Sequence, residues 1–214
     1  FWRGDLTELR RLLEGIGLEV NILFGPSSHG LDEWRAIPTA ELNLVLSPWL
    51  GLSIARHLQK TYDQPLLHLP ALPIGARATA AFLRAIAAAT GLDNERVEAF
   101  IASEEKQYYH YIRDFAHFYS GCTSQYRLPS EINVVGESAY VLAIARFFVG
   151  DLGLNPGVFV ITENPPDEER AGIIAAFRDL APGVDATPVF EPDGHKARAL
   201  IKAHPRTGEY PIVF

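Results

Sequence analysis

Three side chains with metal-ligating chemistry share one predicted helix. His110, Asp114 and His117 are separated by four and three residues, which places them on one face of an α-helix. Imidazole and carboxylate groups are ligands for divalent cations, but one helix alone rarely completes a coordination shell. The spacing therefore predicts either a weak cation site that needs waters or a second chain, or an ordinary solvated helix face.

Cys122 is the only cysteine of the chain. The chain can therefore form no internal disulfide, and alone it cannot supply the ligands of a cysteine-bound zinc ion or iron–sulfur cluster. An unbridged thiol fits a reducing cytoplasm, which is the expected location. No residue is assigned as catalytic or cofactor-binding, and none as an established metal ligand.

The segment Val134-Val135-Gly136-Glu137-Ser138 reads as a strand, a glycine turn and a helix start. It superficially resembles a phosphate cradle, but a dinucleotide fingerprint needs three glycines and this segment has one. The Glu137 carboxylate would also repel a pyrophosphate. A capped helix start is the preferred interpretation.

The predicted elements alternate as in an α/β protein. Short apolar runs predict strands at residues 18–24, 42–46, 65–69, 132–136, 157–162, 186–190 and 211–214, and periodic segments between most of them predict helices. Asp5 is expected to cap the first helix. This order implies parallel sheets with right-handed crossovers, and Pro188 places its strand toward a sheet edge.

The best-defined strand lies in Leu42-Asn43-Leu44-Val45-Leu46-Ser47-Pro48-Trp49, an apolar run closed by Ser-Pro. It predicts a buried parallel strand that ends at Ser47, because proline cannot donate to a ladder. Ligands gather in the loops that follow such strands, but an ordinary strand-to-helix turn is the preferred interpretation.

A long helix from Asp93 to about Tyr119 is expected to span about 40 Å, more than one small domain needs. It would cross between domains or lie along a subunit interface. We expect a first Rossmann-like unit at residues 1–122, ending in this helix. A second unit follows at residues 128–214, truncated at its C-terminus.

Composition excludes several classes of protein. A net charge of −7 argues against nucleic-acid binding, and 48% hydrophobic with 21% charged residues is typical of a globular protein. No run is long enough to span a membrane, and no signal peptide is recognised. The chain starts without methionine and stops inside an apolar run, so we expect a piece of a longer subunit.

Several motifs, in order and at similar spacing over nearly all 214 residues, resemble the β subunit of nitrogenase component 1. Besides the run ending in Ser47-Pro48-Trp49, they are Phe1-Trp2-Arg3-Gly4-Asp5-Leu6, Leu69-Pro70-x-x-Pro73-Ile74-Gly75, Gly136-Glu137-Ser138-Ala139-Tyr140 and Thr162-Glu163-Asn164-Pro165-Pro166. The resemblance is closest to the alternative nitrogenases, the iron-only type before the vanadium type.

This resemblance implies an oxidoreductase of nitrogen fixation, in which an assembled complex reduces dinitrogen to ammonia with ATP-driven electron delivery. The implied partners are the α subunit, a second β subunit, a small accessory subunit and the nitrogenase reductase (the iron protein). The full subunit would help to hold an iron–sulfur cluster (the P-cluster) through cysteines outside this chain. The chain alone is expected to hold none and to be inactive.

Two positions gain meaning from the resemblance. Ser47 stands where related α subunits carry a cysteine that ligates the active-site cofactor, which favours a β-type chain. His110 and Asp114 stand where molybdenum-type relatives place two carboxylates that bind a structural cation between β subunits.

Two rival interpretations stay open. A cofactor-assembly scaffold of the same superfamily would carry similar units without catalysing the reaction. A metal-chelate solute-binding module also joins two α/β lobes by a long helix.

Overall fold

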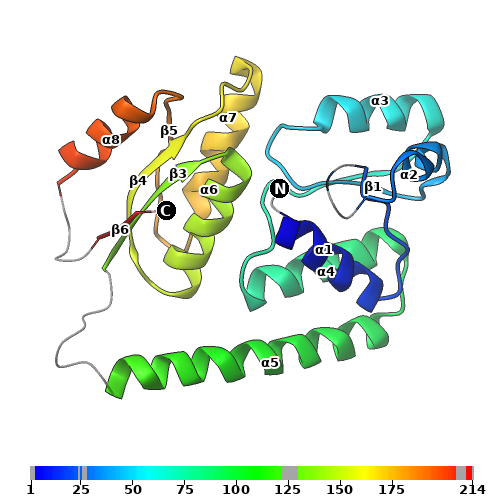
Figure 1. Cartoon of the computed structure of the whole chain (residues 1–214), viewed down its shortest axis with the longest axis horizontal. Coiled ribbons are helices and arrows are strands. Elements are labelled where there is room, and N and C mark those ends of the chain that lie inside the picture. The colour runs from blue at the N-terminus through cyan, green and yellow to red at the C-terminus, as the bar shows by residue number, and fades with distance from the viewer. Residues whose placement is uncertain (1–2, 24, 26–27, 122–129, 206–210, 214) are drawn as a thin grey trace.

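The computed structural model is an α/β protein with two parallel sheets flanked by helices, which confirms the predicted fold class (Figure 1). The structure describes residues 3–23, 25, 28–121, 130–205 and 211–213. The predicted boundary between the two units, residues 123–127, lies outside these residues. Within the described part, no helix combines the length and the apolar character needed to cross a bilayer.

The first sheet contains two strands. β1 (Asn43–Val45) and β2 (Leu66–His68) run parallel, with Asn43 opposite Leu66 and Val45 opposite His68. The helical segments around them are α1 (Arg3–Gly15), α2 (Leu31–Arg35), η1 (Ile37–Thr39), α3 (Leu52–Tyr62) and α4 (Ala76–Thr90). The predicted strand is present but shorter than expected: β1 ends at Val45, two residues before Ser47, and Leu44 is only half-buried.

The strand expected at residues 18–24 is wrong over its described part, because residues 18–23 pair with no strand. Their carbonyl groups instead accept side-chain donors: the Arg10 guanidinium lies 2.8 Å from the Val20 oxygen, and the Trp34 indole Nε1 lies 2.9 Å from the Leu23 oxygen. The expected Asp5 cap is also wrong. Helix α1 begins at Arg3, and Asp5 lies in its first turn.

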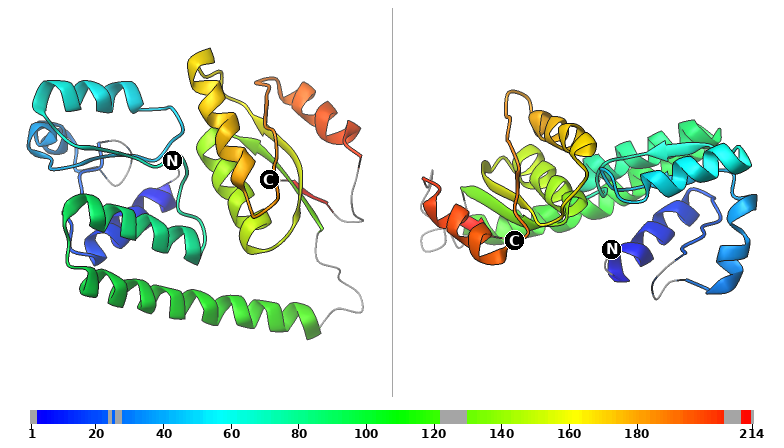
Figure 2. Two further views of the ribbon diagram at one scale, coloured as in Figure 1. Left: turned by 180° about the vertical axis from the view of Figure 1, so that it is seen from behind. Right: turned by 90° about the horizontal axis from the view of Figure 1, so that it is seen from above.

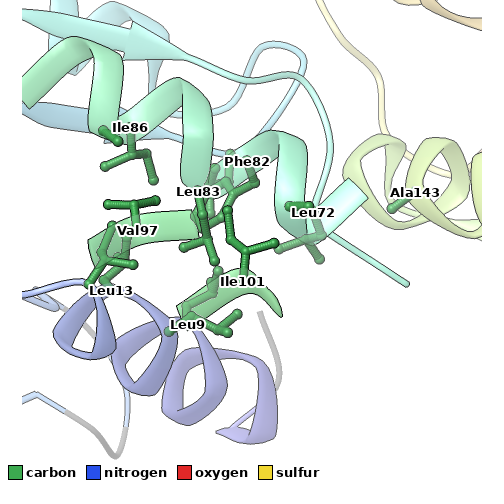
Figure 3. Packing of buried hydrophobic residues seen from close by; sticks show 14 residues of the cluster. Leu9, Leu13, Leu72, Phe82, Leu83, Ile86, Val97, Ile101 and Ala143 are labelled. Atoms are coloured by element: carbon green, nitrogen blue, oxygen red, sulfur yellow. The ribbon is translucent and has the colours of Figure 1, made fainter. Parts of the chain in front are cut away.

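The core of the first unit is built by three helices. Leu9 and Leu13 of α1, Leu83 of α4, and Val97 and Ile101 of α5 (Asn94–Gly121) are all buried and point toward one another (Figure 3). Their spacing of three or four residues on each helix produces the stripe that packing requires. This cluster contains far more buried residues than the cluster at the small sheet, which consists of Val45, Leu52 and Ala55.

Helix α5 is the predicted long helix. Its 28 residues correspond to about 42 Å of length. Its first turns pack on α4, where Arg84 pairs with Glu98 at 2.6 Å. Its later turns run past α1 and α4 toward the second unit (Figures 1 and 2).

The second sheet has the strand order β5-β4-β3-β6 and is parallel throughout. Its elements are β3 (Glu131–Gly136), α6 (Ser138–Ala145), the π-helical turn η2 (Arg146–Asp151), β4 (Asn155–Ile161), α7 (Asp167–Ala176), η3 (Phe177–Asp179), β5 (Val189–Phe190), α8 (Gly194–Ala203) and β6 (Pro211–Val213). Helices α6 and α7 lie on the side of the sheet that faces the first unit, and α8 lies on the other side (Figure 2). The four strands predicted for this unit are confirmed, and β5 is an edge strand, as Pro188 indicates.

Contacts between α6 and the first unit hold the two halves together. Tyr140 of α6 donates a hydrogen bond to Asp5 of α1, and Ala143 belongs to the buried cluster of the first unit. At the end of η2, Asp151 pairs with Arg77 of α4 at 3.2 Å. In the loops after β1 and β2, Trp49 and Ala71 also pack against the buried cluster of the second unit.

Candidate functional site

The loop after β1 is held by its own serine. The Ser47 hydroxyl accepts a hydrogen bond from the Leu50 amide at 3.1 Å, and its carbonyl oxygen lies 2.8 Å from Nε2 of His68. Ser47 is 6% exposed. Its side chain is thus used to shape the turn, and it presents no free nucleophile to a substrate.

Trp49, in this loop, contacts the second unit. Its ring packs against the buried cluster formed around β3, β4 and α6, whereas its indole Nε1 is buried without a hydrogen-bond partner among the described residues. The next helix adds an ion pair, Arg56 of α3 with Glu169 of α7 at 3.7 Å. The end of the first sheet therefore meets the second unit through the packing of Trp49 and the Arg56–Glu169 pair.

The start of α6 is capped by a distant carboxylate. Oε2 of Glu163, which follows β4, accepts a hydrogen bond from the Ser138 backbone amide at 2.6 Å. Parallel strands bring their carboxyl ends to one sheet edge, so a residue after β4 can reach the helix that starts after β3. The carboxylate occupies the position that a phosphate would take, which supports the preference for a capped helix start over nucleotide binding.

Sequence reasoning missed this role of Glu163, although its position directly after a predicted strand was the available signal. Two polar atoms beside the cap, Oγ of Ser138 and Oε1 of Glu163, are buried and lack a protein partner within the described residues. Ser138 is fully buried. These two oxygens can accept hydrogen bonds from water, and nothing in their chemistry resembles a site for a metal cluster.

The candidate cation residues are only partly brought together. Nε2 of His110 lies 3.6 Å from Oδ2 of Asp114, and their side chains are 58% and 61% exposed. Arg113 lies between them in sequence and places its guanidinium 3.8 Å from Asp114 and 3.4 Å from the His110 ring. The side chain of His117 is outside the described residues, so the three-residue site stays a prediction.

No group of three or more His, Cys, Asp or Glu side chains suited to a metal ion occurs in the described part of the chain. An iron–sulfur cluster is a separate question, because its usual ligands are cysteine thiolates. The chain has one cysteine, Cys122, which lies outside the described residues. This chain alone therefore cannot supply the ligands of such a cluster.

The sequence of this chain matches a known protein family. Residues 1–205 match the family described as nitrogenase component 1 type oxidoreductase. The chain belongs to this family, which is the family that the motifs resemble.

Several curated relatives are subunits of one enzyme. The chain is 32% identical over 151 residues to a subunit of the light-independent protochlorophyllide reductase of Methylobacterium sp. (strain 4-46), covering 71% of this chain and 27% of the relative. The corresponding subunit from Halorhodospira halophila is 30% identical over 151 residues, covering 71% and 26%. The chain thus spans about a quarter of the length of these relatives.

Proposed function

We propose that this chain is part of a β-type subunit of a component 1-type reductase. In such a complex, a separate reductase protein delivers electrons in an ATP-driven process. The observation that carries the proposal is the family match over residues 1–205, together with the ordered motifs along the same span. The serine at position 47 supports the β-type assignment, because the resemblance implies a cofactor-ligating cysteine at this position in α-type chains.

In this proposal the chain acts as a rigid support. The Asp5–Tyr140 hydrogen bond and the Arg77–Asp151 pair hold the two units against each other, and Glu163 fixes the start of α6. The iron–sulfur cluster would be held by cysteines elsewhere in the subunit. The proposed location of the complex is the cytoplasm.

Two substrates are compatible with the family. The motif resemblance supports dinitrogen reduction by an alternative nitrogenase, of the iron-only type rather than the vanadium type. Its partners would be an α subunit, a second β subunit, a small accessory subunit and the iron protein. The names of the curated relatives support a second candidate, the reduction of protochlorophyllide.

The family match bears differently on the two rival interpretations. A cofactor-assembly scaffold belongs to the same superfamily and is distinguished by its lack of turnover. A metal-chelate solute-binding module has no support from the comparisons, because the family matched is an oxidoreductase family.

The test is anaerobic reconstitution of the full-length protein with its co-encoded partner and reductase. We expect ATP-dependent reduction of one of two probes, acetylene for a nitrogenase or protochlorophyllide for its relative, and no reduction when the reductase is omitted. A complex that reduces neither probe but passes its metal cofactor to another apo-protein would instead be an assembly scaffold.

A further inference from the structure

The second sheet is covered incompletely on one of its two faces. All four of its strands are parallel, and sheets of this kind normally carry helices on both faces. Among the described residues, α6 and α7 cover one face, whereas α8 is the single helix on the other (Figure 2). Only Ala197 of α8 is buried, so this helix packs on the sheet along a narrow contact.

Apolar side chains are exposed at both edges of this face. Val189 of β5 lies opposite Val160, and Val213 of β6 lies opposite Asn133. The neighbours of Val160 and Asn133 along their strands pack in the buried cluster on the side of α6, so these four residues point to the side of α8. Val160 and Asn133 are buried, but Val189 and Val213 are 38% and 56% exposed. The two edge strands therefore offer apolar surface beside α8.

Helix α8 adds apolar and basic surface to the same face. Leu200 is 37% exposed, and Lys196, four residues before it, is its exposed neighbour on the helix. Arg198 and Lys202 form a second exposed pair at the same spacing. Residues 194–208 contain four Lys or Arg and no Asp or Glu, although the whole chain has a net charge of −7. Within the described part of the chain, the three cations of α8 form no ion pair, so their positive charge faces solvent.

We propose that this face is a docking site for an acidic amphipathic helix of a partner protein. Such a helix would lie beside α8 as a further member of the incomplete helix layer, with its apolar stripe on Leu200 and an exposed edge strand and its carboxylates near Lys196. The parallel sheet favours a helix as the occupant. The exposed apolar side chains favour an apolar stripe, and the cations of α8 select acidic side chains beside that stripe. The inference does not depend on which substrate the complex reduces.

The test uses the full-length protein and a fluorescein-labelled synthetic peptide in which leucine and glutamate repeat with helical period. Fluorescence anisotropy should show saturable binding to the wild type. Lys196→Glu should weaken this binding at least about tenfold, because the substitution replaces an attraction by a repulsion. Leu200→Asn should also weaken it, because apolar contact area is lost. Thermal melts that match the wild type show that both variants are folded.

The matched control is Lys60→Glu, which makes the same charge change at an exposed position of α3 in the first unit. It should change the affinity less than about twofold. The proposal is overturned if the wild type does not bind the peptide, or if Lys60→Glu weakens binding as much as Lys196→Glu. Equal binding of a peptide with lysine in place of glutamate, or serine in place of leucine, would also overturn it. Binding to vesicles of anionic phospholipid but not to the peptide would overturn it in favour of a lipid-binding face.

Discussion

At the residue scale, Glu33 shows how a buried charge is made stable. It is 5% exposed, and its carboxylate accepts hydrogen bonds from the His29 amide at 2.9 Å and from Arg10 at 3.0 Å. Burial by itself would raise the pKa of Glu33. The hydrogen bonds from Ser28, from the Ile22 and His29 amides and from Arg10 outweigh burial and lower the pKa from 4.5 to about 2. The carboxylate therefore ties α2 to the loop before it and to α1.

We expect Glu33→Gln to lower the free energy of unfolding at pH 7 by about 1–3 kcal/mol, because charge-assisted hydrogen bonds are lost. Since folding lowers this pKa, the contribution is complete above about pH 4.5 and is lost as the pH falls toward 2. Urea denaturation from pH 7 to 3 measures the free energy of unfolding of both proteins. A constant difference between them over this range would contradict the assignment.

Gly75 is fixed by both its backbone and its neighbour. Its φ of 86° and ψ of 160° lie in a region that is nearly restricted to glycine, and an added Cβ would lie 2.6 Å from the Phe147 ring. Gly91→Ala is the matched control, because Gly91 has a φ of 67° and open space around it. Thermal melts should show a loss of about 1 kcal/mol for Gly91→Ala and clearly more for Gly75→Ala. Equal losses would mean that the contact with Phe147 is unimportant.

At the scale of elements, the strands that local patterns predict are those with a partner in a sheet. The second unit was predicted strand by strand, because each apolar run is flanked by turn residues and pairs in a four-stranded parallel sheet. Residues 18–23 carry a similar apolar pattern but find no strand partner, and side-chain donors from Arg10 and Trp34 bind their carbonyls. The Glu163 cap was missed for the same reason, because it joins residues that are 25 positions apart.

The packing of the first unit predicts which element matters most for its stability. Leu83→Ala should cost about 2–5 kcal/mol, because Leu83 is 1% exposed at the centre of the three-helix cluster. Leu44→Ala in β1 should cost less than about 2 kcal/mol, because its side chain is only half-buried. Chemical denaturation of both variants shows which substitution lowers the free energy of unfolding more. The reverse order would place the core at the small sheet.

The cation hypothesis for α5 also belongs to this scale. Two exposed ligands, His110 and Asp114, can hold a metal only weakly, so zinc or manganese should give a small heat of binding that is lost in H110A/D114A. Binding should also weaken in acid, because a protonated imidazole cannot ligate. Isothermal titration at pH 7.5 makes the comparison. Equal heats for wild type and variant would leave this face as solvated surface.

At the scale of the whole molecule, the two units pack against each other, and the chain has a single cysteine. They are joined by packing at Trp49 and Ala143 and by the Asp5–Tyr140 hydrogen bond. The α/β class and the parallel arrangement followed from the sequence, because strand and helix patterns alternate along it. The particular reaction did not follow, because the single cysteine of this chain cannot by itself supply the ligands of an iron–sulfur cluster.

The iron and acid-labile sulfide content of the full-length protein, purified anaerobically as wild type and as Cys122→Ser, tests the central claim most directly. We predict that both proteins carry the same cluster iron and sulfide, because the ligands lie outside this chain. Loss of the cluster in Cys122→Ser, or its absence from the wild-type protein, would contradict the account.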